Sequence, residues 1–263
     1  MPFSSIPSDS YAAVVTALRS AGCVFAEDEA RLIVSTAGTP AELTAMVDRR
    51  SAGLPLEHVL GWAEFCGLRI AVEPGVFVPR RRTEFLVQQA LASAPEAPAV
   101  VVDLCCGSGA VGAALAASLP GAELHAADID PAAVRCARQN VGERGHVHKG
   151  DLFEPLPRTL RGRVDVLAAN VPYVPTEEVG LLPPEARDHE PLVALDGGGD
   201  GLDILRRVTA EAPLWLAPAG SLLVETSERQ ASVAVETFAD AGLVPRLAVS
   251  EELYSTVVIG TRS

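Results

Sequence analysis

Two short stretches combine residue types and spacings that could hold a nucleotide-like molecule and act beside it. The first is DLCCGSGAVG, in which Gly107, Gly109 and Gly112 form the pattern G-x-G-x-x-G between an apolar run and a small-residue stretch. The second is ANVPYVPT, in which Asn170, Pro172 and Tyr173 follow the apolar run VDVLAA. Each stretch therefore stands where a buried strand is expected to end.

The glycines of the first stretch let the backbone approach a ligand closely. Asp128 lies about 20 residues further on, at the expected end of the next strand, where a carboxylate can accept hydrogen bonds from both hydroxyls of a ribose. This pattern fits a nicotinamide dinucleotide as well as S-adenosylmethionine. A tight strand-to-helix turn followed by an exposed aspartate is the structural alternative.

Asp103 favours S-adenosylmethionine over a dinucleotide. It stands four residues before Gly107, so its negative charge is expected at the tip of the strand. A carboxylate there suits the cationic amino group of S-adenosylmethionine and is poorly placed beside a pyrophosphate. Asp151 and Leu152 stand at the expected end of a third strand, where they could hold the amine and one face of an adenine. For Asp151, a simple turn residue is the alternative.

Asn170 is the candidate for orienting a methyl acceptor. Its side-chain oxygen, with neighbouring backbone carbonyls held by Pro172, would form a set of hydrogen-bond acceptors aimed at one small group. Such acceptors suit a planar amino or amide nitrogen, because fixing both of its hydrogens aligns the nitrogen with the methyl carbon. Tyr173 would supply an aromatic wall. Standing alone, N-x-P-Y is also typical of a turn after a strand.

The elements that must position these residues change in kind along the chain. Three stretches before residue 60 predict short helices, and the third has Thr39 as N-cap, Pro40 at the first helical position and Glu42 closing a capping box. The alternating, turn-rich segment 64–80 predicts a hairpin. From Ala99 onward, β-branched runs alternate with helical stretches, which predicts a mostly parallel sheet covered by helices.

The expected fold is therefore a doubly wound, mostly parallel, Rossmann-like α/β sheet with an antiparallel C-terminal strand, preceded by a small helical domain and a linking hairpin. The predicted boundaries are 1–60 for the helical domain, 61–80 for the hairpin and 81–263 for the sheet domain. The run SAPEAPA at 93–99 predicts a boundary linker.

Composition narrows the class of protein. The apolar fraction of 48% excludes wholesale disorder, and no apolar run reaches the length of a membrane span. Five cysteines without a C-x-x-C pair, and a beginning unlike a signal peptide, predict a cytoplasmic protein. The net charge of −13 makes a nucleic-acid partner unlikely. Arg80-Arg81-Arg82 is a dense basic cluster, which we interpret as the solvated start of a helix.

The motifs together resemble a known group of enzymes. D-x-x-x-G-x-G followed by N-x-P-Y resembles the amino-methyltransferases that use S-adenosylmethionine, which include DNA adenine and protein-glutamine methyltransferases. Residues 55–87 and 189–208 look like segments of the protein-(glutamine-N5) methyltransferase family, the HemK/PrmC type that modifies peptide-chain release factors. The resemblance covers roughly residues 55–263 and implies a protein substrate that bears a glutamine, docked in part by the helical domain.

The resemblance also implies a role for each matching residue. The cofactor would be S-adenosylmethionine, and no metal would be needed. The implied cofactor-binding residues are Asp103, Cys105, Cys106, Gly107, Ser108, Gly109, Asp128, Ile129, Asp151, Leu152 and Asn170. The implied catalytic residues are Asn170, Val171, Pro172 and Tyr173, which would also bind the substrate together with Phe77 and Glu190. Glu190 would line the substrate mouth, or alternatively cap the following segment.

Four positions depart from the family pattern. Val171 replaces the first proline of N-P-P-Y, which keeps the carbonyl that the family uses but removes backbone stiffness and adds an N–H group. Cys105 stands where the family usually has glycine. Arg81 and Arg82 stand where it usually has a proline and an acid. Methyl transfer remains the expectation, while the protein substrate is left open.

Other interpretations compete with this one. An N-methyltransferase acting on a small molecule or a nucleic acid would share Asn170, and a relative that binds the cofactor without turnover would explain the departures at 105 and 171. A dehydrogenase would share the glycines but not Asp103. His146 and His148 form an H-x-H pair with no third ligand in view, so no metal site is expected.

Overall fold

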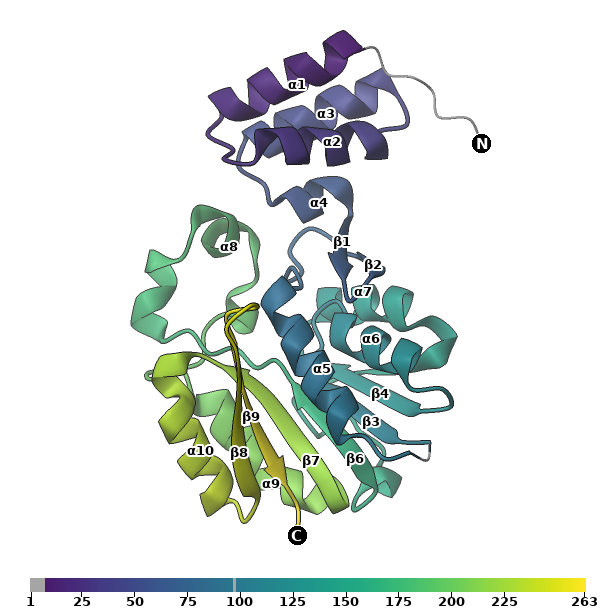
Figure 1. Ribbon diagram of the computed structural model, residues 1–263, viewed down its shortest axis with the longest axis vertical. Coiled ribbons are helices and arrows are strands. Elements are labelled where there is room, and N and C mark those ends of the chain that lie inside the picture. Colours follow the sequence, from purple (N-terminus) through teal and green to yellow (C-terminus); the bar gives the residue numbers. More distant parts are fainter. Residues whose placement is uncertain (1–7, 97) are drawn as a thin grey trace.

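The computed structural model describes residues 8–96 and 98–263, and shows a small helical domain beside a larger layered α/β domain (Figure 1). The helical domain consists of α1 (Ser8–Ser20), α2 (Ala26–Thr36), α3 (Pro40–Ser51) and the short α4 (Leu56–Leu60). The buried side chains Leu18, Ile33 and Met46 form part of its core. Residues 1–7, the first part of the predicted helical domain 1–60, lie outside the described residues.

The capping box predicted for the third helix is present. The Thr39 hydroxyl accepts a hydrogen bond from the Glu42 N–H at 3.2 Å, and the Glu42 carboxylate accepts one from the Gly38 N–H at 2.8 Å. Glu42 therefore reaches one residue further back than the motif predicts. The bond to Thr39 satisfies a backbone donor that the first turn of the helix leaves unpaired, and the bond to Glu42 holds the residue before the N-cap.

The predicted hairpin is also present, as β1 (Trp62–Phe65) paired antiparallel with β2 (Leu68–Ala71). Asn140 fixes it to the sheet domain. The Asn140 amide exchanges two hydrogen bonds of 2.8 Å with the backbone of Ala71 and donates a third to the carbonyl of Ser108 in the glycine-rich loop. Asn140 thus anchors the hairpin to the glycine-rich loop.

One seven-stranded sheet, in the order β5-β4-β3-β6-β7-β9-β8, forms the centre of the larger domain. Neighbours from β5 to β7 pair in parallel, and β9 pairs antiparallel with both β7 and β8. The predicted fold class is confirmed. The strands are β3 (Val100–Leu104), β4 (Glu123–Asp128), β5 (Gly145–Lys149), β6 (Val164–Ala169), β7 (Leu216–Thr226), β8 (Val244–Ser250) and β9 (Ser255–Thr261).

Helices bury both faces of the sheet, which is why its central strands read as nearly continuous apolar runs. Val101, Val166 and Leu223 face one apolar layer, while Leu167 and Leu222 face the other. The helices are α5 (Glu84–Ser93), α6 (Ala110–Ser118), α7 (Pro131–Val141), α9 (Asp203–Trp215) and α10 (Ala231–Asp240). A further short helix, α8 (Pro184–His189), lies in the long segment between β6 and α9.

The predicted boundary linker at 93–99 does not separate two domains. Phe85 and Leu86 of α5 pack on the same apolar layer as Val101 and Val166 of the sheet. The stretch therefore joins α5 to β3 within one domain, and Ala97 in it lies outside the described residues. The chain leaves β3 outward to β4 and β5, then returns to β6 on the other side of β3. At this reversal the carboxyl ends of the strands diverge, which creates a ligand crevice.

Candidate functional site

A cavity of about 1780 Å³ opens at the carboxyl ends of the strands. Its wall brings together the residues to which the sequence assigns cofactor or substrate binding, with the exception of Gly109 and Glu190. The predicted residues at the wall are Phe77, Asp103, Cys105, Cys106, Gly107, Ser108, Asp128, Ile129, Asp151, Leu152, Asn170, Val171, Pro172 and Tyr173.

Two acids organise the glycine-rich loop. Asp103 is 1% exposed, and its carboxylate accepts a hydrogen bond from the Gly112 N–H at 2.8 Å. A Cβ at Gly112 would lie 3.0 Å from that oxygen, so this approach depends on glycine. Asp128 accepts hydrogen bonds from the N–H groups of Gly107 and Asp130 at 2.8 and 2.9 Å. Burial raises the pKa of Asp103 to about 7 and also raises the pKa of Asp128.

The backbone of this loop explains both a match and a departure. Cys105 has a φ of +53°, in the left-handed region that favours glycine, which gives a physical reason for the glycine usual at this position. Gly109 has a φ of +76°, and a Cβ there would lie 3.0 Å from Ala137 of α7. Gly109 therefore permits close packing of the loop against α7 and does not line the cavity.

Asp151 and Leu152 occupy the predicted place beyond β5. Leu152 is buried at the wall with a φ of +45°. The Asp151 carboxylate accepts a hydrogen bond from the Arg207 guanidinium of α9 at 2.6 Å. Asp151 is thus held by a partner that the sequence does not indicate, and it remains at the cavity wall.

Asn170 directly follows β6, and the residues after it are anchored by the backbone of another loop. The Val174 N–H donates to the Leu195 carbonyl at 3.0 Å, and the Gly197 N–H donates to the Val174 carbonyl at 2.9 Å. Gln230 donates through its side chain to the Tyr173 carbonyl at 3.0 Å. The segment 195–201 therefore supports the stretch from 170 to 174 from behind.

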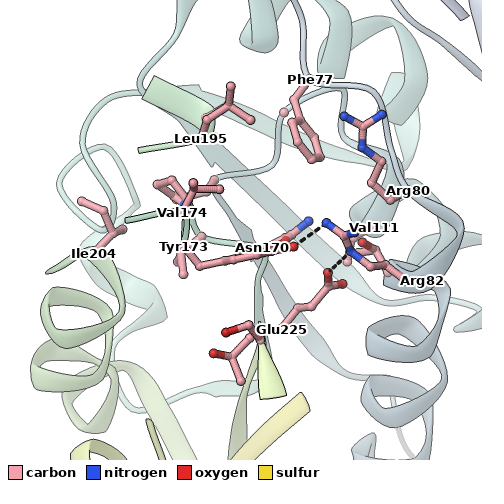
Figure 2. Close-up of a pocket in the computed structure, with 18 of the residues that line it drawn as sticks. Phe77, Arg80, Arg82, Val111, Asn170, Tyr173, Val174, Leu195, Ile204 and Glu225 are labelled. Carbon is pink, nitrogen blue, oxygen red and sulfur yellow. Dashed lines mark hydrogen bonds and ion pairs between the residues drawn. The ribbon is translucent and has the colours of Figure 1, made fainter. Parts of the chain in front are cut away.

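Tyr173 faces two charged side chains in the cavity (Figure 2). The guanidinium of Arg82 donates one hydrogen bond to the Tyr173 hydroxyl and another, of 3.0 Å, to the Glu225 carboxylate at the end of β7. Burial raises the pKa of Tyr173, and Glu225 adds to the shift. The basic cluster does precede a helix as predicted, and Arg82 is exposed, but its guanidinium also lines the cavity beside a buried acid.

Glu190 holds the chain that leaves the hairpin. Its carboxylate accepts two hydrogen bonds from Arg80, at 2.6 and 2.7 Å, and one from the Val78 N–H at 3.1 Å. The Arg80 guanidinium in turn stacks over the ring of Phe77 at 5.0 Å. Glu190 thus acts on the cavity through Arg80 and Phe77, both of which line it.

The H-x-H pair lies elsewhere in the molecule. His146 and His148 pack against His125 of β4, and a ring nitrogen of His125 lies 2.9 Å from one of His148. Burial lowers the pKa of both His125 and His148. Within residues 8–96 and 98–263, no group of side chains is suited to hold a metal ion.

Among the helices of these residues, none has the length and apolar character that a membrane span requires.

Sequence reasoning noted Arg82 without placing it in the cavity, and it missed Glu225 and Gln230 altogether. Glu225 carried a usable signal, because it ends the apolar run SLLVE just as Asp103 ends VVVD and Asn170 follows VLAA. For Arg82 and Gln230 there was no such signal. Their partners come from strands and loops far along the chain.

Comparison with known proteins gives consistent results. A sequence model of the methyltransferase small domain matches residues 67–181. Release factor glutamine methyltransferases from Geobacter sulfurreducens and Mycolicibacterium smegmatis are 42% and 39% identical to this chain. The alignments cover 77% and 82% of this chain, and 72% and 78% of those proteins.

Solved structures share the fold at low sequence identity. A methyltransferase from Pyrococcus furiosus has a TM-score of 0.57 at 16% identity, over 84% of this chain and 98% of that one. A ribosomal protein L11 methylase from Lactobacillus delbrueckii subsp. bulgaricus has a TM-score of 0.54 at 16% identity, over 74% and 85% of the two chains. These likenesses concern the fold alone.

Proposed function

The chain belongs to the release factor glutamine methyltransferase family, and we propose that it methylates the side-chain amide of a glutamine in a peptide-chain release factor. It is a methyltransferase that uses S-adenosylmethionine. The observation that carries the choice of acceptor is the position of Asn170, at the cavity wall directly after β6 and one strand away from Asp103.

The residues at the ends of β3, β4 and β5 fit S-adenosylmethionine. Asp103 is a buried carboxylate that forms no ion pair with another described residue, so a cationic amino group would match it. Asp128 offers carboxylate oxygens for the ribose hydroxyls, and Ile129 and Leu152 offer apolar surface for the adenine. Once bound, the cofactor supplies a methyl group that its sulfonium activates toward nucleophiles.

Asn170 and the carbonyl of Val171 would hold the two hydrogens of the acceptor nitrogen. An amide nitrogen is a weak nucleophile whose lone pair is delocalised, so orientation and exclusion of water contribute more than a strong base. Tyr173 and Phe77 would flank the side chain on its way in. After transfer the nitrogen carries a surplus proton, which leaves to solvent through the open side of the cavity.

The test is methyl transfer to a defined residue. Purified enzyme, methyl-labelled S-adenosylmethionine and a candidate release factor are incubated, and the product is mapped by mass spectrometry. The expected product carries one methyl group on a glutamine, and no label after that glutamine is replaced by alanine. Label that persists in the alanine variant would contradict a glutamine acceptor, and label found only in added DNA would favour a nucleic-acid substrate.

Asn170→Ala tests the assigned role of the amide. Loss of one positioned hydrogen-bonding group in a reacting site typically costs about 10²–10³-fold in kcat, and we expect a loss of that size here. The affinity for S-adenosylmethionine, measured by calorimetry, should change much less, because the acids that bind the cofactor are intact. An unaffected kcat would show that Asn170 does not orient the acceptor.

A further inference from the structure

Three side chains from separate elements meet on the N-x-P-Y stretch, and we call Arg82, Tyr173 and Glu225 the tyrosine clamp. Arg82 lies in a short 3₁₀ turn (Arg81–Thr83) before α5, Tyr173 follows β6, and Glu225 lies near the end of β7. Figure 2 shows Arg82 between the other two side chains, next to Asn170. The Arg82 guanidinium carbon also lies 5.9 Å from the centre of the Tyr173 ring.

The ion pair between Arg82 and Glu225 holds the Arg82 guanidinium in place. Glu225 is 2% exposed in its side chain, whereas Arg82 is 44% exposed, toward the cavity. One oxygen of Glu225 accepts from Arg82, and the other has no hydrogen-bond partner among the described residues. A buried carboxylate with a single charged partner favours the geometry that keeps that partner in place. The guanidinium is thereby held where it can reach the Tyr173 hydroxyl.

The clamp acts on a stretch whose stiffness this chain has reduced. Asn170 directly follows β6, Pro172 has the restricted φ of any proline, and the Tyr173 carbonyl accepts a hydrogen bond from Gln230. Val171 lies between them, where the family resemblance implies a second proline. Its side chain is buried in the core, and its N–H donates no hydrogen bond to another described residue. The Tyr173 N–H likewise donates no hydrogen bond to another described residue, so φ at Val171 and at Tyr173 is restrained neither by a ring nor by an N–H bond, and the clamp holds the second of these residues.

We propose that the tyrosine clamp replaces the missing proline ring: Arg82 is a positioning residue that holds Tyr173 and so aims Asn170 and the carbonyl of Val171 at the acceptor. This rests on the proposed function, since the stretch is taken to bind the acceptor. It explains two departures from the family pattern together. The arginine that replaces an acid at 82 compensates for the valine that replaces a proline at 171. A purely structural role for Arg82, neutralising Glu225, is the alternative.

A mutant cycle separates these two roles. Arg82→Gln cuts the clamp, and a displacement of about 1 Å in a reacting group can cost about 10²-fold, so a loss of kcat up to that size is expected. In the Val171→Pro background the same substitution should cost about tenfold less, since the ring then supplies the stiffness. Arg81→Gln is the matched control, because Arg81 does not line the cavity and should leave kcat unchanged.

Tyr173→Phe keeps the proposal testable if Arg82→Gln fails to fold. This variant removes only the hydroxyl that accepts from Arg82 and leaves the Arg82 pair with Glu225 in place. Its loss of kcat should also shrink in the Val171→Pro background. Equal losses in both backgrounds would overturn the proposal, and so would a Val171→Pro enzyme that has lost transfer altogether, because the stretch would then require the freedom that the ring removes.

A readout without substrate separates failure of this proposal from failure of the proposed function. Hydrogen exchange of the peptide covering residues 167–175 reports on the Val174 N–H, which bonds to the Leu195 carbonyl. Arg82→Gln should speed this exchange at least threefold relative to Arg81→Gln, and Val171→Pro should slow it again. Exchange that responds as expected in an enzyme without glutamine transfer would refute the substrate alone, while unchanged exchange would refute the clamp.

Discussion

The environment of Asp103 sets the pKa of its carboxyl group. It is buried without a cation beside it, and the single hydrogen bond from Gly112 does not offset the burial that raises its pKa to about 7. In the unliganded protein the neutral acid is therefore favoured below about pH 7. The stability that Asp103 contributes is fully present below its ordinary pKa of 3.8 and is lost as pH rises through about 7.

Cofactor binding should show the opposite pH dependence. The amino group of S-adenosylmethionine favours ionised Asp103, so affinity should tighten as pH rises toward about 7, by at most about tenfold per unit. Calorimetry across this range tests the prediction, and Asp103→Asn should remove the dependence while weakening binding. Methylthioadenosine, which lacks the amino-acid part, is the control ligand. A flat profile for S-adenosylmethionine would show that its amino group does not engage Asp103.

The predictability of the site differs from residue to residue for a physical reason. Asp103, Asp128 and Asn170 were predictable because parallel strands bring their carboxyl ends to one edge, so a polar residue after an apolar run marks that edge. Arg82 was not, because its partner Glu225 is 143 positions away and no local spacing signals the contact. The role of Glu190 was likewise hidden in a pair with Arg80, 110 positions away.

At the scale of elements, the loop behind the N-x-P-Y stretch requires glycine at more than one position, and Gly201 is the glycine that lies against Tyr173. Gly201 has a φ of +78°, and a Cβ there would lie 2.3 Å from the Tyr173 carbonyl oxygen and 2.4 Å from the Gln230 amide. Any side chain would push the support away from the residues that it fixes. The loop and the stretch are therefore one structural unit, although the sequence shows them as separate motifs.

Gly201→Ala should damage activity more than stability. We expect kcat to fall about 10–10²-fold through displacement of Tyr173, with a loss of about 1–3 kcal/mol in the free energy of unfolding from the strained backbone. Gly199→Ala in the same loop is the control, since a Cβ at Gly199 meets nothing within 4 Å. Kinetics and urea unfolding of both variants provide the measurement. Equal behaviour of the two variants would argue against a supporting role.

The regular elements were largely predictable, and the short ones were not. The strands and long helices of the sheet domain follow apolar patterns that their buried faces require. α4 and α8 have only five and six residues, too few to be stable by themselves, so tertiary contacts decide whether they form. The irregular start of β7, where its register with β6 shifts, was also beyond local pattern.

At the scale of the whole molecule, one arginine joins the helical domain to the mouth of the cavity. Arg50 of α3 is buried and pairs with Glu29 of α2 at 2.6 Å, and it also pairs with Glu185 of α8 at 2.6 Å. Glu185 lines the cavity, and Figure 1 shows α8 on the side of the sheet domain that faces the helices. This contact therefore links the helical domain directly to a residue of the cavity wall.

Glu185→Gln should weaken the use of a protein substrate and spare the chemistry. Glu185 is 50% exposed in its side chain, and such pairs contribute about 0.2–1 kcal/mol, so KM for the release factor should rise by only about twofold to fivefold. KM for S-adenosylmethionine and kcat should stay the same. Glu177→Gln, on the same segment but without an ion pair to a described residue, is the control. A fall in kcat instead would place Glu185 in the reaction itself.

The order of the strands also bears on how this protein is made. The residues of the site come from β5, β4, β3, β6 and β7 and so span most of the sheet domain, and β9 must insert between β7 and the earlier-synthesised β8 before the sheet is complete. Contacts of such sequence separation form slowly, because loop-closure entropy is lost before they become favourable. During synthesis, therefore, the helical domain can fold early. The sheet keeps exposed strand edges until β9 has been synthesised. Folding yield, and hence the need for chaperones, should depend on residues 255–261 more than on any part of the catalytic site.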